Sequence, residues 1–302
     1  MKRNRSMIIT FIFPGTFLFV LTFIYPICRT IIMSFFSIQE ITDKISQWKF
    51  NGIDNYINLM NSSLYISSWI NLFKIFVFGG GITLGISLLF AVILTNKIKG
   101  KAFFQSAIYL PNVISAVAMA TMWTQYVFNS SYGFLRSFFN FLHLDYLANI
   151  QWLDADHKFW ALLISYCFGM VGYYMLIWIS GIKRIDRVYY EAASIDGANK
   201  VKQFFYVTLP LLRGIFRTNI IMWSISVSGF FIWSKLFSPI SADTETVVPM
   251  IYMYDKLFGT ENVDNVTRDA GSSAAIGVML CLFIVIIFTL VNKLIDDNNL
   301  EF

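Results

Sequence analysis

Residues 185–210 read IDRVYYEAASIDGANKVKQFFYVTLP and lie between two long apolar stretches. This segment predicts a short helix, a glycine break and a second short helix. Asp186 can cap the first helix by accepting backbone N–H bonds, and Gly197 permits the left-handed turn that ends it. Pro210 can begin the helix that follows, because its missing N–H costs little in a first turn.

The two short helices differ in the side chains that they would present. Ala192 and Ala193 favour helix and leave little bulk on one face of the first, so we expect a partner with a groove that receives it. Phe204, Phe205 and Val207 would give the second an apolar face. The alternative is an amphipathic loop that lies at the lipid headgroups without a partner.

Outward from this segment the chain is strongly apolar. The 302 residues are 57% hydrophobic and only 14% charged, a balance that a soluble domain of this size could not cover with polar surface. The apolar residues form blocks that reach the roughly 20 residues needed to cross a bilayer. We therefore expect an all-α membrane protein with six transmembrane helices, at about Met7–Phe36, Trp69–Thr95, Phe104–Phe128, Phe159–Ile182, Thr218–Phe237 and Ser272–Val291.

Basic residues mark one side of these spans. Residues 1–6, 97–101 and 183–217, together with Lys293, hold most of the Lys and Arg near span ends, and cytoplasmic loops carry such an excess. Both termini are therefore predicted to be cytoplasmic. The net charge is +5, but the basic residues lie at the ends of the apolar spans and do not form one basic stripe, so no nucleic-acid partner is expected. The histidines and cysteines lack metal-ligand spacing, so we expect no metal site.

Two other classes of membrane protein fit the sequence less well. A channel or ion-coupled carrier would need acidic residues at mid-membrane, and Asp and Glu are essentially absent from the expected spans. An intramembrane enzyme would need a His, Asp or Ser–Lys constellation at membrane depth, and neither histidine lies there. Residues 80–87 resemble a phosphate-binding loop, but isoleucine replaces its lysine. Gly81 and Gly85 are predicted instead to allow close helix packing.

The order Glu191-Ala192-Ala193, then Gly197, then Leu209-Pro210 resembles the EAA loop of bacterial binding-protein-dependent ABC permeases. In that family the loop forms a coupling helix that sits in a cleft of a separate ATPase subunit. The resemblance therefore implies that Glu191 contacts an ATPase and that Gly197 allows the bend. The residues that it assigns to this coupling loop are Glu191, Ala192, Ala193, Asp196, Gly197, Leu209 and Pro210.

Further stretches resemble the carbohydrate branch of these permeases, with its maltose-permease F-like and glycerol-phosphate-permease A-like subunits. They include Gly52–Tyr56 and Leu110-Pro111. The resemblance implies a type I ABC importer permease fold in the bacterial inner membrane, with 1–68 as first helix and external segment. It also implies a permease core over 69–293, a coupling loop over 183–217 and a cytoplasmic tail over 294–302.

The same resemblance predicts the partners and the cargo. A G-like permease subunit would complete a heterodimer, two ABC ATPase subunits would hold ATP and Mg, and an extracellular solute-binding protein would deliver a sugar or oligosaccharide. This chain would catalyse nothing and hold no cofactor. The alternative cargo is a non-sugar solute such as a glycerol-phosphate, or an acidic saccharide.

Candidate residues for the substrate path come from three of the expected spans. Sugars are bound by aromatic faces that stack on their C–H surfaces and by hydrogen-bonding side chains. Counted back from the motif glutamate, Tyr173 falls where the maltose permease has a sugar-contacting tyrosine, so the resemblance gives it that role. Trp223, Ser226 and Phe230 are predicted to share one face of the fifth span. Helix packing or lipid contact is the alternative for these aromatic residues.

Two polar residues of the third expected span complete the candidates. Gln125 and Asn112 are uncommon side chains at membrane depth, so each predicts either a substrate contact or a hydrogen bond between helices.

Overall fold

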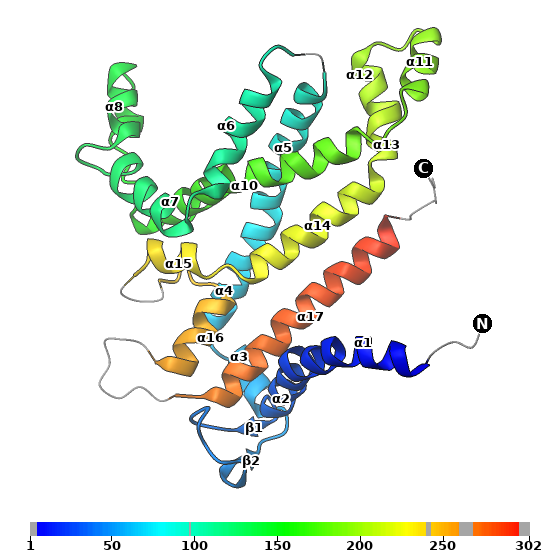
Figure 1. Ribbon diagram of the computed structural model, residues 1–302. Helices are drawn as coiled ribbons and strands as arrows, with labels where there is room; N and C mark the ends of the chain where they lie inside the picture. The colour runs from blue at the N-terminus through cyan, green and yellow to red at the C-terminus, as the bar shows by residue number, and fades with distance from the viewer. Residues whose placement is uncertain (1–4, 97, 240–242, 260–267, 296–302) are drawn as a thin grey trace. The chain divides into compact units, whose positions relative to one another are not determined.

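The structure is a computed structural model that describes residues 5–96, 98–239, 243–259 and 268–295, with side chains from residue 10 onward (Figure 1). It is helical nearly throughout, and the strands in the described part are a short antiparallel pair. The chain forms two compact units, one of Met1–Tyr65 with Tyr252–Leu282 and one of Ile66–Ile251 with Phe283–Phe302.

The first unit begins with one long helical stretch. A π-helical turn interrupts it directly before Pro26, where the widened turn accommodates a ring that cannot donate an N–H bond. The elements of this unit are α1 (Arg5–Phe19), η1 (Val20–Ile24), α2 (Tyr25–Met33), β1 (Phe36–Ser37), η2 (Ile45–Gln47), β2 (Lys49–Phe50) and α3 (Asp54–Met60).

The Gly52–Tyr56 stretch has a structural role in this unit. The buried amide of Asn55 donates to the carbonyls of Ser34 and Phe36, both at 2.9 Å, and the Tyr56 hydroxyl donates to Ser34 Oγ at 2.7 Å. These bonds satisfy carbonyls left free where α2 ends, and so fix the path of the chain into β1.

Three helices run along the chain from one unit into the other: α4 (Ser63–Lys74), α16 (Pro249–Phe258) and α17 (Ala270–Leu294). The second unit is built around α10, which packs against α5, α6 and α14 (Figure 1). Its elements are η3 (Ile75–Gly79), α5 (Gly80–Thr95), α6 (Lys101–Val113), α7 (Ala116–Met122), η4 (Trp123–Val127), α8 (Phe134–Phe141), α9 (Asp145–Ala148), α10 (Ala155–Ile182), α11 (Arg187–Ile195), α12 (Lys200–Gln203), η5 (Phe204–Thr208), α13 (Leu209–Leu211), α14 (Arg213–Ser228) and α15 (Ile232–Phe237).

Close packing around α10 depends on glycines other than the predicted pair. A Cβ on Gly172 would meet the Ile108 carbonyl of α6, and one on Gly181 would lie 2.6 Å from the Ile215 side chain. Gly81 and Gly85 have no atom within 4 Å of such a Cβ. The prediction that these two glycines pack closely is therefore wrong within this chain.

A loop that follows α15 is held to two helices of the second unit. Lys158 pairs with Asp243 at 2.7 Å, and the buried amide of Asn71 donates to the carbonyls of Thr244 and Val247 at 2.8 and 3.0 Å. The loop is thereby bonded through two backbone carbonyls to α4 and through the Asp243 carboxylate to α10.

Four helical stretches of the described chain are long and apolar enough to cross a membrane, namely Thr10–Met33, Ser63–Thr95, Ala155–Ile182 and Ala270–Leu294. They correspond to the first, second, fourth and sixth expected spans. The expected tail lies outside the described residues from position 296 onward.

The third expected span is not one straight helix. The helices Lys101–Val113 and Ala116–Val127 meet at an angle of 96°. Ile114 and Ser115 are extended at the corner, and Ser115 Oγ caps the next helix by accepting from Ala118 N at 3.4 Å. The prediction of a continuous helix over 104–128 is therefore wrong, because the chain breaks and is capped again at Ser115.

The fifth expected span also differs from the prediction. The helix starts at Arg213, five residues before the expected Thr218, and ends at Gly229, and α15 follows as a separate element. Gly229 has a φ of −87° and a ψ of 18°, and the helical conformation ends there. The continuous helix expected over 218–237 is thus α14 and α15 on either side of a break.

Candidate functional site

The loop segment, residues 186–211, has the predicted order of helix, glycine break and helix. Asp186 Oδ1 accepts from Val188 N at 3.1 Å and caps α11. Gly197 has a φ of +79°, the left-handed conformation that glycine tolerates best. Asn199 then caps α12 by accepting from Lys202 N at 2.9 Å. The predicted roles of Asp186 and Gly197 are confirmed, and the Asn199 cap was not predicted.

The second arm of the loop segment is longer than expected, because α12, η5 and α13 follow one another directly from Lys200 to Leu211. Pro210 lies in the first turn of α13, as predicted. Of the predicted apolar face, Phe204 and Val207 are half-buried and Phe205 is exposed, whereas the buried residues of this arm are the polar Gln203 and Thr208.

These buried polar side chains join the two arms of the loop segment. Gln203 Nε2 donates to Ser194 Oγ at 2.8 Å and to the Ala198 carbonyl at 3.1 Å. The hydroxyls of Tyr190 and Thr208 lie 2.9 Å apart. Sequence reasoning missed this network, because no pattern in the sequence shows which side of the second arm faces the first.

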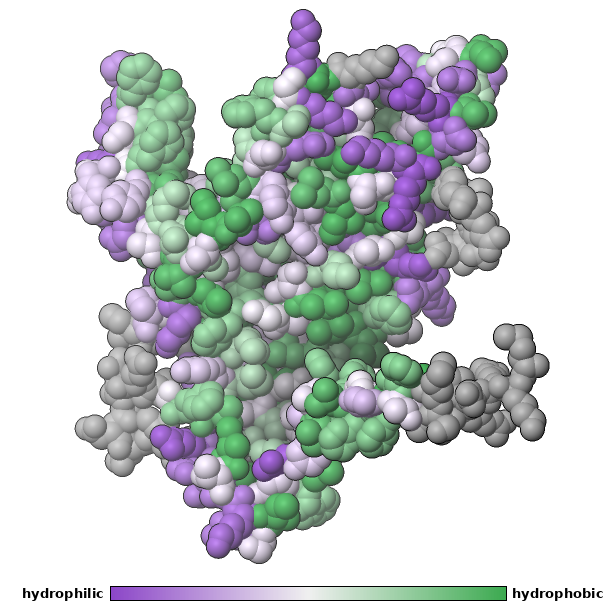
Figure 2. All heavy atoms as spheres, viewed as in Figure 1, coloured by the Kyte–Doolittle hydropathy of each residue, from purple (hydrophilic) through white to green (hydrophobic). Residues whose placement is uncertain are grey.

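The outer face of the loop segment is exposed and partly apolar. No residue of α11 is buried, Val188 is 62% exposed and Ile195 is 87% exposed. Glu191 and Asp196 are exposed beside them. Figure 2 shows polar and apolar side chains mixed at this end of the second unit. Exposed apolar residues on an internally bonded helix pair, outside the membrane spans, are typical of a surface that binds another protein.

Candidate path residues of α10 and α14 meet at a cluster of aromatic side chains. The half-buried Tyr173 lies edge-to-face on Tyr174, with ring centroids 5.1 Å apart, and the Tyr174 hydroxyl lies 3.4 Å from Ser226 Oγ. Tyr166 contacts Phe230 at 4.7 Å and Trp223 at 5.6 Å between centroids. The structure thus brings four of the six path candidates around neighbouring tyrosines of α10.

Trp223 has a structural role in this cluster. It is 1% exposed, and its indole N–H donates to the Phe76 carbonyl at 2.9 Å. A Cβ on Gly80 would lie 2.7 Å from the indole nitrogen, so a larger residue at this position would clash with the Trp223 ring. Phe76 belongs to η3, and in a π turn some backbone carbonyls lack an intrahelical N–H donor. Trp223 therefore joins α14 to the η3 turn.

Phe230, Asn112 and Gln125 lie in three different places in the chain. Phe230 lies beyond Gly229, outside α14, so the predicted common helical face with Ser226 is wrong for Phe230. Asn112 donates to the Gly169 carbonyl at 3.2 Å and so links α6 to α10. Gln125 is exposed on η4, on the other side of the 96° bend. Among the described residues, no group of three His, Cys, Asp or Glu side chains could hold a metal ion.

Comparison with known proteins identifies the family of this chain. The family described as "Binding-protein-dependent transport system inner membrane component" matches residues 3–298. The chain belongs to this family. The probable ABC transporter permease protein YesP of Bacillus subtilis is 33% identical over 234 residues, which cover 75% of this chain and 73% of YesP.

Other relatives and a solved structure extend this match over nearly the whole chain. The arabinooligosaccharides transport system permease protein AraP of Halalkalibacterium halodurans is 27% identical over 294 residues, 94% of this chain and 86% of AraP. One chain of a crystal structure of a bacterial ABC transporter for the acidic polysaccharide alginate matches with a TM-score of 0.78 at 18% identity, covering 97% and 96% of the two chains.

These matches confirm the interpretation of the sequence at the level of the family. The chain is a multi-pass permease subunit of an ABC importer in the inner membrane, with the type I permease fold. The family is one of transport subunits, and the EAA resemblance of the loop segment agrees with it.

Proposed function

We propose that this permease subunit imports a sugar or oligosaccharide that an extracellular solute-binding protein delivers. Relatives with oligosaccharide names support this cargo, since AraP is named for arabinooligosaccharides and the Streptomyces coelicolor protein NgcF for diacetylchitobiose uptake. The alginate transporter has been crystallised with an alginate pentasaccharide-bound periplasmic protein, which supports delivery by such a protein. A second permease subunit of G-like type completes the heterodimer in this proposal.

The energy for transport comes from two partner ATPases that bind ATP and Mg and dock on the loop segment. The observation that carries this proposal is the build of the loop segment. No residue of α11 is buried, and hydrogen bonds from Gln203 and Thr208 of the second arm hold α11 in place. A surface that its own hydrogen bonds hold in shape can receive a partner at low entropic cost. Glu191, Ala192 and Asp196 are exposed there, and Ala193 is half-buried.

Charge reversal at Glu191 tests the docking proposal. Glu191→Lys should reduce copurification of the ATPase subunits and substrate uptake at least about tenfold, because it places a cation where the partner meets a carboxylate. Asp156→Lys is the matched control, since Asp156 is also exposed but lies in the first turn of α10. Unchanged copurification by Glu191→Lys would remove the docking assignment.

We further propose that the substrate passes beside Tyr173 and Ser226. A half-buried aromatic ring and a half-buried hydroxyl are the two kinds of group that bind sugars. The buried Trp223 lies against Tyr174, with ring centroids 5.8 Å apart, and the buried Phe230 lies against Tyr166. Asn112 and Gln125, which come earlier in the chain, remain candidates.

Transport assays with a panel of solutes test the path and the cargo. Tyr173→Ala should raise the transport KM for the preferred saccharide about tenfold, as expected for a lost stacking contact. Tyr146→Ala, at an 85% exposed tyrosine outside the cluster, is the control. Equal uptake of every solute by both variants would contradict the path.

A second candidate cargo has its own support. The UgpA proteins, 26% identical to this chain, are named for sn-glycerol-3-phosphate transport. Uptake of sn-glycerol-3-phosphate, with no uptake of arabino- or chito-oligosaccharides, would favour this alternative.

A further inference from the structure

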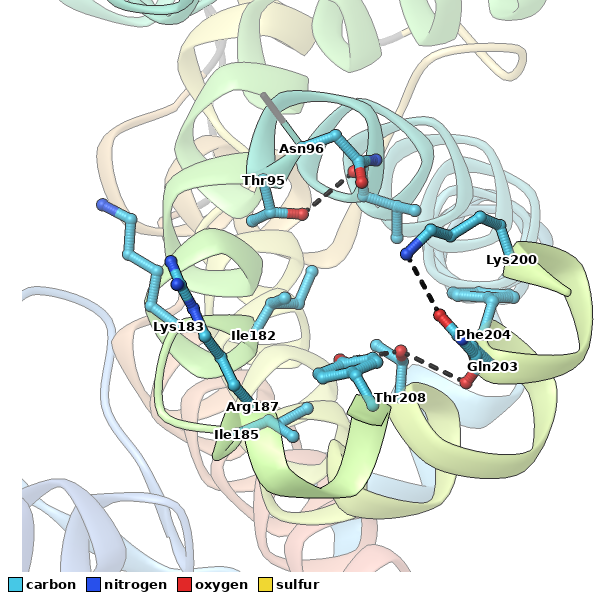
Figure 3. A pocket seen from close by; sticks show the side chains of 12 residues that line it. Thr95, Asn96, Ile182, Lys183, Ile185, Arg187, Lys200, Gln203, Phe204 and Thr208 are labelled. Atoms are coloured by element: carbon cyan, nitrogen blue, oxygen red, sulfur yellow. Dashed lines mark hydrogen bonds between the residues drawn. The ribbon is translucent and has the colours of Figure 1, made fainter. Parts of the chain in front are cut away.

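A cavity of about 370 Å³ lies behind the loop segment (Figure 3). One wall comes from the last turn of α5 and the end of α10, and the other from the inner sides of α11, α12 and η5. Its volume is within the range of roughly 300–1,000 Å³ that small-molecule sites occupy. The docking face described above is the outer side of the same helices, so the cavity is a separate feature.

Positive charge dominates the lining of this cavity. Lys183, Arg187 and Lys200 line it, and no Asp or Glu is among the described residues that do. The Lys200 ammonium points into the space and donates to Gln203 Oε1 at 3.2 Å, while the Arg187 side chain rises on the opposite side (Figure 3). An anion held between Lys200 and Arg187 would be attracted by both charges.

The types of side chain indicate which anion fits. Arginine presents a planar fork of N–H donors that matches phosphate oxygens, and lysine adds a point charge. The amide of Asn96 also lines the space, and one of its two N–H groups donates to the Val92 carbonyl at 2.9 Å, which leaves the other for a further oxygen. A tetrahedral phosphate group uses such converging donors from several directions.

The position of the cavity indicates where the phosphate comes from. The apolar spans Ser63–Thr95 and Ala155–Ile182 both end at its wall. The ends of membrane spans lie at the level of the lipid headgroups, and the anionic lipids of the cytoplasmic leaflet attract basic segments there. A soluble phosphate compound can reach the same depth from the cytoplasm.

We propose that this cavity binds the phosphate group of an anionic phospholipid headgroup or of a soluble phosphate compound. The ligand bridges the ends of α5 and α10 to α11 and α12, and thereby holds the loop segment against the membrane spans. Binding belongs to the permease itself, so it can be measured without any ATPase and does not depend on the docking at Glu191.

Binding measurements on the full-length permease, purified with its partner subunit, test this site. The probes are radiolabelled inorganic phosphate in detergent, and lipid retention seen by native mass spectrometry after transfer from nanodiscs of phosphatidylglycerol or phosphatidylcholine. The test variant is Arg187→Gln with Lys200→Gln. The matched control, Arg184→Gln with Lys202→Gln, removes the same two kinds of charge from exposed positions of the same region that do not line the cavity.

The expected result is that the native protein and the control bind at least one probe equally, and that the test variant loses at least about tenfold in affinity. Phosphate binding identifies a soluble source, and retention of phosphatidylglycerol alone identifies a lipid. Absence of binding by the native protein, or equal binding by test and control variants, would overturn the proposal. If the double variant does not accumulate, Arg187→Gln and Lys200→Gln are measured singly, and affinities equal to the native value would also overturn it.

Discussion

Replacing Gln203 with leucine removes the hydrogen bonds that join the arms of the loop segment while keeping a side chain of similar size. Gln203 is 4% exposed, and its amide donates two bonds, of 2.8 and 3.1 Å. Each such bond contributes about 1 kcal/mol net, so the loss is about 2 kcal/mol. The bond from Lys200 adds least, because the lysine is exposed.

A loss of this size should raise the population of the open loop segment about 30-fold, since 1.4 kcal/mol corresponds to a factor of ten. Hydrogen exchange of peptides from α11 and α12, followed by mass spectrometry, measures this directly. Lys202→Leu is the control, because it adds leucine at an exposed neighbouring position. Equal protection in Gln203→Leu and the native protein would refute the claim that these bonds hold the segment together.

Three further substitutions test the packing of the second unit. Gly172→Ala places a methyl group against a backbone carbonyl of α6 and should lower the melting temperature by about 5 °C, whereas Gly81→Ala meets no atom within 4 Å and should not. Trp223→Phe leaves a carbonyl of η3 unpaired and should lower the stability by about 1–3 kcal/mol in denaturant unfolding. Lys158→Met breaks the ion pair with Asp243 and should speed proteolysis of the loop after α15 about threefold; an unchanged rate would contradict that role.

Features that depend on neighbouring residues in the chain could be predicted from the sequence. Asp186, Gly197 and Pro210 act through local backbone chemistry, and each lies in the structure where that chemistry places it. The long apolar helices likewise follow from the sequence, because a long apolar segment in a bilayer must satisfy its backbone hydrogen bonds internally, as a helix does. The family resemblance rested on the same local signals.

Features that depend on contacts between residues distant in the chain could not be predicted from the sequence. Nothing in residues 104–128 distinguishes a bent pair from one helix, because Ser115 becomes a cap only once the chain has turned. Trp223 was a path candidate because aromatic residues serve both binding and packing, and only its bond to Phe76 decides between these roles. The inward position of Gln203 required the opposite arm of the loop segment to be in place.

The attachment of Trp223 to η3 has a mechanical consequence for transport. Only the buried Leu212 separates the loop segment from α14, so a displacement of the loop enters that helix directly. The hydrogen bond from Trp223 to the Phe76 carbonyl then links that helix to η3, so a displacement of α14 also acts on the span Ser63–Thr95.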